Sequence, residues 1–163
     1  MAGVLKILRR YQWITDPLPT LTQPLAIGYS LSTMPRRHFD WLRQAKRKLE
    51  SARWNLQGNF FEDACFASQQ AAELAAKALL ESRGRIELGH SILHLLTVAG
   101  GVPQDLIDAS KVLDRYYVLT RYPNGFAEGA PMDYYDAPAA RGAIDYAQRI
   151  IDYVDQELSR VQT

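Results

Sequence analysis

The segment YYVLTRYPNGF, residues 116–126, places a cation among aromatic side chains and directly before a proline. Arg121 stands in it, followed by Tyr122 and Pro123. A guanidinium offers paired donors that suit a phosphate, and Tyr122 supplies a ring beside it. An arginine near a helix end also interacts favourably with the helix dipole, so a purely structural role stays open. We expect a ligand contact or a structural link at this point.

The predicted helix over residues 60–83 carries a polar arc with further candidates. Such an arc is usually a solvated face. Phe66 projects into the same arc, however, and an apolar side chain there indicates a covered surface, either a dimer contact or a groove. The ligand-binding candidates on this arc are Glu73 and Lys77. The polar members of the arc are Gln69, Gln70, Glu73 and Lys77.

His90 lies just before a short predicted helix that begins at Ser91. It is either a cap-region residue bonded to backbone or a ligand contact. Four residues separate it from Arg85. Cleavage of RNA needs a group that takes the 2′-hydroxyl proton and a cation that holds the phosphate. Arg85 and His90 are therefore one candidate catalytic pair, although this spacing often occurs by chance.

Composition and charge exclude several classes of protein. The chain has 163 residues, 47% of them hydrophobic, and a net charge of +1, which suits one domain with its own core. The single cysteine, Cys65, cannot form an internal disulfide, and with three scattered histidines it makes no structural zinc site. We expect no metal and no cofactor. No apolar run approaches the roughly 20 residues that span a bilayer, so we expect a cytoplasmic protein without a membrane contact.

The sequence changes character at about residue 35. Residues 15–35 contain four prolines and show no hydrophobic period, which is typical of an extended or flexible arm. We therefore assign residues 1–35 to an N-terminal arm and residues 36–160 to a helical domain. Met34 directly precedes the helical pattern and is an alternative start of the chain.

Apolar residues recur at helical spacing throughout the second region. No strand pattern accompanies them, so the predicted fold is all-α, an antiparallel up-and-down bundle of about five helices. Alanines such as Ala71 and Ala75 form the inner face of the second helix, which lets its neighbours approach closely. A long loop follows Pro123. The predicted helices cover about residues 36–57, 60–83, 90–99, 103–122 and 136–158.

Three stretches of sequence carry a resemblance to a known family. They are FEDACFASQQAAELAAKALL at 61–80, GHSILHLL at 89–96 and LDRYYVLTRYP at 113–123. In this order and spacing they resemble the HEPN domain family, over about residues 36–158. The resemblance implies a short bundle of about five helices that usually dimerises. It also implies a cytoplasmic prokaryotic protein, often encoded beside a minimal nucleotidyltransferase as a toxin–antitoxin pair, and a nucleotide-binding role.

One branch of that family consists of metal-independent ribonucleases in which four to six residues separate an arginine from a following histidine. Phe126, Ala127 and Glu128 occupy those positions after Arg121, so the motif is absent there. We therefore favour a non-catalytic module that binds a nucleotide or nucleic-acid phosphate, a nucleotidyltransferase partner, or both. A ribonuclease toxin and a purely structural dimerisation domain are the two alternatives.

The first predicted helix has a basic face. This face is either solvated or attracts phosphate or RNA. Trp54 lies off the apolar stripe beside these cations, where it would stack on a base or anchor a partner. Phe66, Tyr146 and Tyr153 are also off-stripe aromatics, and the apolar area left over predicts a homodimer. The cations that share the face are Arg43, Lys46, Arg47 and Arg53.

Overall fold

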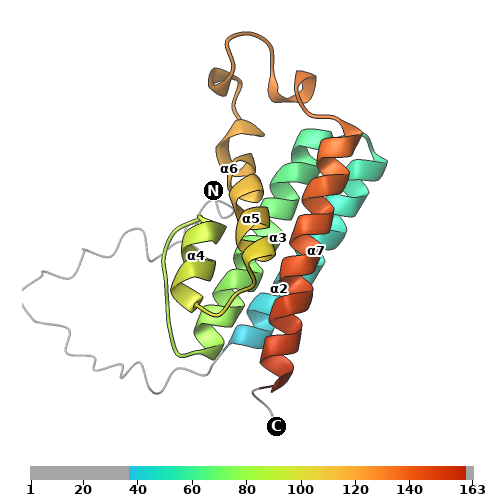
Figure 1. Cartoon of the computed structure of the whole chain (residues 1–163). Helices are drawn as coiled ribbons and strands as arrows, with labels where there is room; N and C mark the ends of the chain where they lie inside the picture. The colour runs from blue at the N-terminus through green and yellow to red at the C-terminus, as the bar shows by residue number, and fades with distance from the viewer. Residues whose placement is uncertain (1–36, 161–163) are drawn as a thin grey trace, which may run out of the picture. The chain divides into compact units, whose positions relative to one another are not determined.

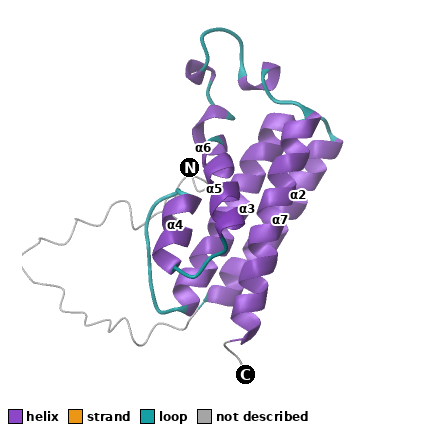
Figure 2. Ribbon diagram, viewed as in Figure 1, coloured by secondary structure: helices purple, strands orange, loops and turns teal. Residues whose placement is uncertain are grey.

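The computed structural model describes residues 37–160, and within that range all regular structure is helical (Figure 2). This confirms the predicted all-α bundle. The arm predicted at residues 1–35, with Met34, lies outside the described residues. The α-helices are α2 (His38–Gln57), α3 (Phe61–Ser82), α4 (Ile92–Ala99), α5 (Gln104–Asp114), α6 (Tyr116–Leu119) and α7 (Ala137–Arg160).

Three long helices, α2, α3 and α7, pack side by side along most of their length (Figure 1). The tight turn after Gly58 reverses the chain, so α2 and α3 are antiparallel. Asn59 has a φ of 62° in this turn, a conformation that asparagine tolerates better than most residues. Each long helix buries one apolar stripe, and that of α2 consists of Leu42, Ala45, Leu49 and Ala52.

Helix α3 is central and contacts every other α-helix of the described domain. Half of its buried positions are alanines, so the neighbouring backbones approach it closely and the larger side chains of the other helices fill the remaining space. The predicted contact points Ala71 and Ala75 are both fully buried. The buried alanines of α3 are Ala64, Ala67, Ala71, Ala72, Ala75, Ala76 and Ala78.

The shorter helices α4, α5 and α6 cover another side of α3 (Figure 1). The segment between α3 and α4 runs back along α3, so α4 points in the same direction as α3. The Asp114 carboxylate caps α4, because it accepts hydrogen bonds from the Ser91 hydroxyl and from the backbone N–H groups of Ile92 and Leu93.

The helix predicted over residues 103–122 is divided in the structure. The Arg115 N–H donates to the Val112 carbonyl, an i→i−3 bond that tightens the chain between α5 and α6. Helix α6 ends at Leu119, so Arg121 lies just beyond it rather than in a last helical turn. The long loop that follows contains two short 3₁₀ turns, Pro123–Gly125 and Pro131–Asp133.

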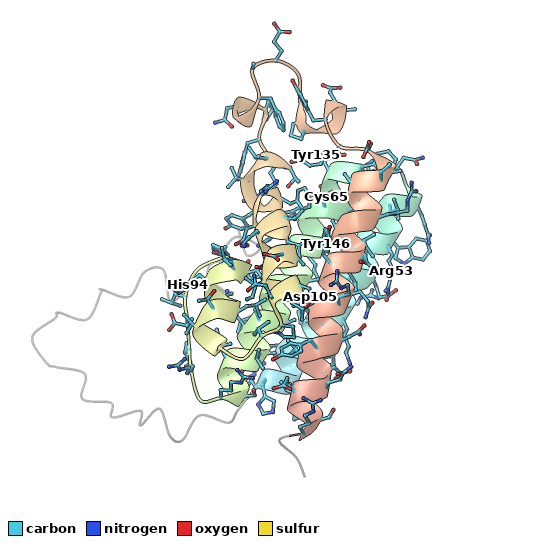
Figure 3. The ribbon with its side chains drawn as sticks, viewed as in Figure 1. Arg53, Cys65, His94, Asp105, Tyr135 and Tyr146 are labelled. Carbon is cyan, nitrogen blue, oxygen red and sulfur yellow. The ribbon has the colours of Figure 1, made fainter. Side chains whose placement is uncertain are left out.

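Cys65 and several tyrosines meet near the start of α3 (Figure 3). Cys65 is fully buried. Burial, together with the carboxylates of Asp136 and Glu62, raises the pKa of its thiol to about 12. Burial also raises the pKa of Tyr116, likewise to about 12. Both groups are therefore neutral at pH 7, and the thiol acts as a small apolar side chain.

Replacing Ala75 with leucine tests the central position of α3. The larger side chain has no space between the packed helices, so we expect the free energy of unfolding to fall by about 1–3 kcal/mol in urea denaturation. Gln156→Leu, at an exposed position of α7, is the control and should change stability by less than about 0.5 kcal/mol. An unchanged denaturation midpoint for Ala75→Leu would contradict the packing described above.

Candidate functional site

A buried carboxylate lies at the centre of the polar side chains on α3. Glu73 is only 4% exposed. Lys77 Nζ donates to its Oε1 at 2.8 Å, and both oxygens lie 3.2 Å from His90 Nδ1. The side-chain amides of Gln69 and Gln70 each donate to Oε2 at 3.3 Å. The donors around Glu73 compensate for the loss of water around its charge.

The two glutamines tie this network to the next segment of the chain. Gln69 is fully buried, and its Nε2 also donates to the His90 carbonyl at 3.0 Å. Gln70 Nε2 donates to Gln69 Oε1 at 2.6 Å. The polar arc of α3 is therefore covered in part by the chain's own segment before α4.

His90 connects α3 to α6. Its ring stacks on the Tyr117 ring with the centroids 4.5 Å apart and the planes inclined by 16°. His90 lies directly before Ser91 at the start of α4, in the cap region, but its side chain contacts Glu73 and not the backbone. The Nδ1 atom faces the carboxylate, which orients the ring and leaves Nε2 without a hydrogen-bond partner among the described residues.

Arg121 is enclosed by aromatic rings. Its Cζ lies 4.7 Å from the ring centroids of Phe66 and Tyr117 and 5.0 Å from that of Tyr122. Its Nε donates to the Tyr117 carbonyl at 2.8 Å. Arg121 thus contacts Tyr117 but not Asp114, whose carboxylate bonds to the first residues of α4.

The described part of the chain offers no hydrogen-bond partner to the outer end of the Arg121 guanidinium. Neither Nη group has a hydrogen-bond partner there, and no carboxylate there forms an ion pair with it. Tyr122 is exposed beside it, and Pro123 begins the 3₁₀ turn that leads into the long loop. The rings and the Nε bond fix the guanidinium plane, so its paired N–H groups are available to an oxyanion.

The sequence of almost the whole described domain identifies the family to which it belongs. The model of the HEPN domain matches residues 39–158. The chain belongs to the HEPN domain family. A search among curated proteins found no match.

Solved HEPN structures resemble this domain closely. A protein of Thermus thermophilus is 43% identical, with 75% of this chain and 98% of that one covered and a TM-score of 0.73. An archaeal HEPN homologue is 42% identical, with coverages of 77% and 99% and a TM-score of 0.67. A HEPN domain protein of Thermotoga maritima is 32% identical, with coverages of 74% and 98% and a TM-score of 0.60.

The candidate pair Arg85 and His90 is not brought together in this HEPN domain. The Arg85 guanidinium donates to the Val98 carbonyl at the C-terminal end of α4, whereas His90 lies before its N-terminal end. Helix α4 has 8 residues and therefore extends over about 12 Å. The Tyr117 ring, on which His90 stacks, is contacted by Arg121 instead.

Trp41 is a neighbour of the site that the sequence did not indicate. The Lys77 ammonium lies 5.9 Å from its ring centroid. Trp41 sits one position from the buried stripe of α2, so only the packing of α2 against α3 places it beside Lys77.

No group of three or more metal-ligating side chains occurs within residues 37–160, and no helix there is long and apolar enough to span a bilayer.

Glu73→Gln tests the role of the buried carboxylate in holding these elements together. The amide cannot accept hydrogen bonds at both ends, and Lys77 loses its counter-charge. We expect the free energy of unfolding to fall by about 1–3 kcal/mol in urea denaturation. Glu50→Gln, which alters an exposed carboxylate paired with Arg53, is the matched control and should have little effect. Equal losses in the two variants would contradict a central role for Glu73.

Proposed function

We propose that this HEPN domain is a non-catalytic module that binds the phosphate of a nucleotide or of RNA through Arg121. The observation that carries the proposal is a guanidinium fixed among three aromatic rings whose Nη groups have no partner among the described residues. A charged donor pair with a fixed plane suits two oxygens of a phosphate. Binding costs little conformational entropy, because the packed Arg121 side chain has little freedom left to lose.

The surroundings of Arg121 support a nucleotide rather than a free anion. Tyr122 is 49% exposed beside the guanidinium and offers its ring to a base. His90 and Lys77 add polar groups along the same face of α3, although Glu73 neutralises Lys77. The loop that begins at Pro123 lies next to the site and can fold over a bound group.

We further propose a minimal nucleotidyltransferase as the partner, in a system of the toxin–antitoxin type. Membership of the HEPN family supports this pairing, because such domains are often encoded beside these small enzymes. A nucleotide site on the HEPN domain would connect the two proteins through a shared ligand. The identity of the adjacent gene tests the pairing directly.

Arg121→Lys tests the phosphate site. Lysine keeps the charge but loses the paired donors, so we expect the affinity for AMP to fall by about tenfold or more in calorimetric titration. Arg149→Lys is the matched control, because Arg149 also lies over a tyrosine ring, at 6.0 Å, but on α7. A lower melting temperature for Arg121→Lys with unchanged binding would assign Arg121 a structural role only.

A ribonuclease is the second candidate, and the contact between Glu73 and His90 favours it. A carboxylate that orients an imidazole is the arrangement used to support a general base. The primary proposal expects no cleavage when the pure protein is incubated with RNA and a chelator. Cleavage that is lost in both His90→Ala and Arg121→Lys would replace it with the catalytic alternative.

We also propose a homodimer, on grounds that differ in part from the sequence prediction. Tyr146 and Tyr153 are partly buried and pack against the core, so they leave less exposed apolar area than the sequence indicates. Exposed apolar side chains instead gather around Trp41, where a hollow of about 170 Å³ lies between α2, α3 and the segment before α4. Its exposed apolar lining includes Trp41, Ile86 and Leu88.

Light scattering at micromolar concentration should give the mass of two chains. Leu88 is 87% exposed, and Leu88→Asp should shift the mass toward one chain because it places a charge in the apolar contact. Met132→Asp changes an equally apolar but distant side chain, 69% exposed, and should leave the mass unaltered. A single-chain mass for the wild type refutes the dimer.

A further inference from the structure

Most cations on the outer face of α2 are neutralised within the domain. Arg43 pairs with Asp40 at 3.0 Å, and Lys46 pairs with Asp155 at 2.7 Å. Arg53 pairs with the Glu50 carboxylate. The predicted basic face is therefore smaller than the sequence indicates.

Two cations of α2 remain without such partners. Arg47 and Lys48 form no ion pair and no side-chain hydrogen bond with the described residues. They line a hollow of about 300 Å³ together with Trp54, which is 70% exposed. The other lining residues are Gln44 and Ser51.

The spacing of these residues aligns them along the helix. Arg47, Ser51 and Trp54 stand at i, i+4 and i+7, which places them on one face within about two turns, or roughly 10 Å. One short surface thus offers a guanidinium, an ammonium, a hydroxyl and the face of an indole.

We propose that this surface binds a single-stranded nucleic acid, with one base stacked on Trp54 and an adjacent phosphate on Arg47 and Lys48. Single-strand sites combine exposed aromatic rings with cations that follow the backbone. The roughly 10 Å from Arg47 to Trp54 is within the reach of one nucleotide step and two long side chains. This contact lies on α2 and is independent of the nucleotide site at Arg121.

The composition of the hollow favours a nucleic acid over a protein partner. The centre of a protein interface surrounds its aromatic anchor with apolar side chains and is depleted in lysine. Trp54 is instead accompanied in the hollow by Gln44, Ser51 and two cations that form no ion pair with the described residues. Positive charge without a counter-ion complements a phosphate backbone.

Fluorescence anisotropy with a labelled octauridylate tests the proposal on the full chain. Trp54→Ala should weaken binding by roughly 5- to 100-fold, the loss expected for one stacked base. Trp54→Phe should restore most of the affinity, whereas Trp54→Leu should not, because only an aromatic ring stacks. Arg47→Gln should weaken binding and reduce the slope of log affinity against log salt by about 0.7.

Lys111→Gln is the matched control for charge, because Lys111 lies on α5 and is paired with Asp108. Lys111→Gln should leave the affinity for octauridylate unchanged. A loss equal to that of Arg47→Gln would show that only the net charge of the protein matters, and would overturn the proposal. Absence of octauridylate binding, or equal binding by wild type and Trp54→Ala, also overturns it. So does a change in the light-scattering mass of Trp54→Ala with strand binding retained, which would make Trp54 a protein contact.

These experiments test the proposed Arg121 site and the proposed α2 surface separately. Arg121→Lys is expected to lose AMP while a strand still binds through Trp54. Trp54→Ala is expected to retain AMP binding. If wild type binds AMP but no octauridylate, only the α2 surface is refuted, and the reverse result refutes only the Arg121 site.

Discussion

Glu73 places a carboxylate inside the helical packing, with 4% of the residue exposed. A charge removed from water costs several kcal/mol unless donors surround it. Two glutamines and Lys77 come from α3 itself, but His90 must be brought from the segment before α4. That requirement draws the segment back along α3, sets the direction of α4 and presents the imidazole to Tyr117.

The geometry of the ligand site follows from this contact. Tyr117 stacks on His90, and the same ring lies against the Arg121 guanidinium. The cation is therefore positioned by neighbours that are themselves held by a buried charge, so its Nη groups, which have no partner within residues 37–160, are held in one orientation. The alanine face of α3 is also needed, because it lets the helices pack closely, which excludes water from Glu73 and holds its partners in place.

Periodicity and capping residues predicted the helices well, and the ordered stretches on α3, α4 and α6 predicted the family. The break at Arg115 and the capping of α4 by Asp114 could not be predicted from the sequence. Both depend on the three-dimensional contact between the Asp114 carboxylate and the start of α4, which is more than 20 residues away in the chain. Arg121, Tyr122, Glu73, Lys77 and His90 could be nominated from the sequence as residues. Their arrangement could not, because the stacking of His90 on Tyr117 joins positions 27 residues apart. Of the predicted basic face of α2, ion pairing leaves only Arg47 without an ionic partner among the described residues.

The central claim is that a prepositioned Arg121 guanidinium receives a phosphate. Nuclear magnetic resonance of the arginine side-chain N–H groups during a titration with AMP tests it most directly, with the Arg121 signals assigned by their loss in Arg121→Lys. The account predicts that the Nη signals of Arg121 sharpen and shift with saturation, while those of Arg149 do not move. Shifts confined to other arginines, or no shift of Arg121 at saturating AMP, would contradict it.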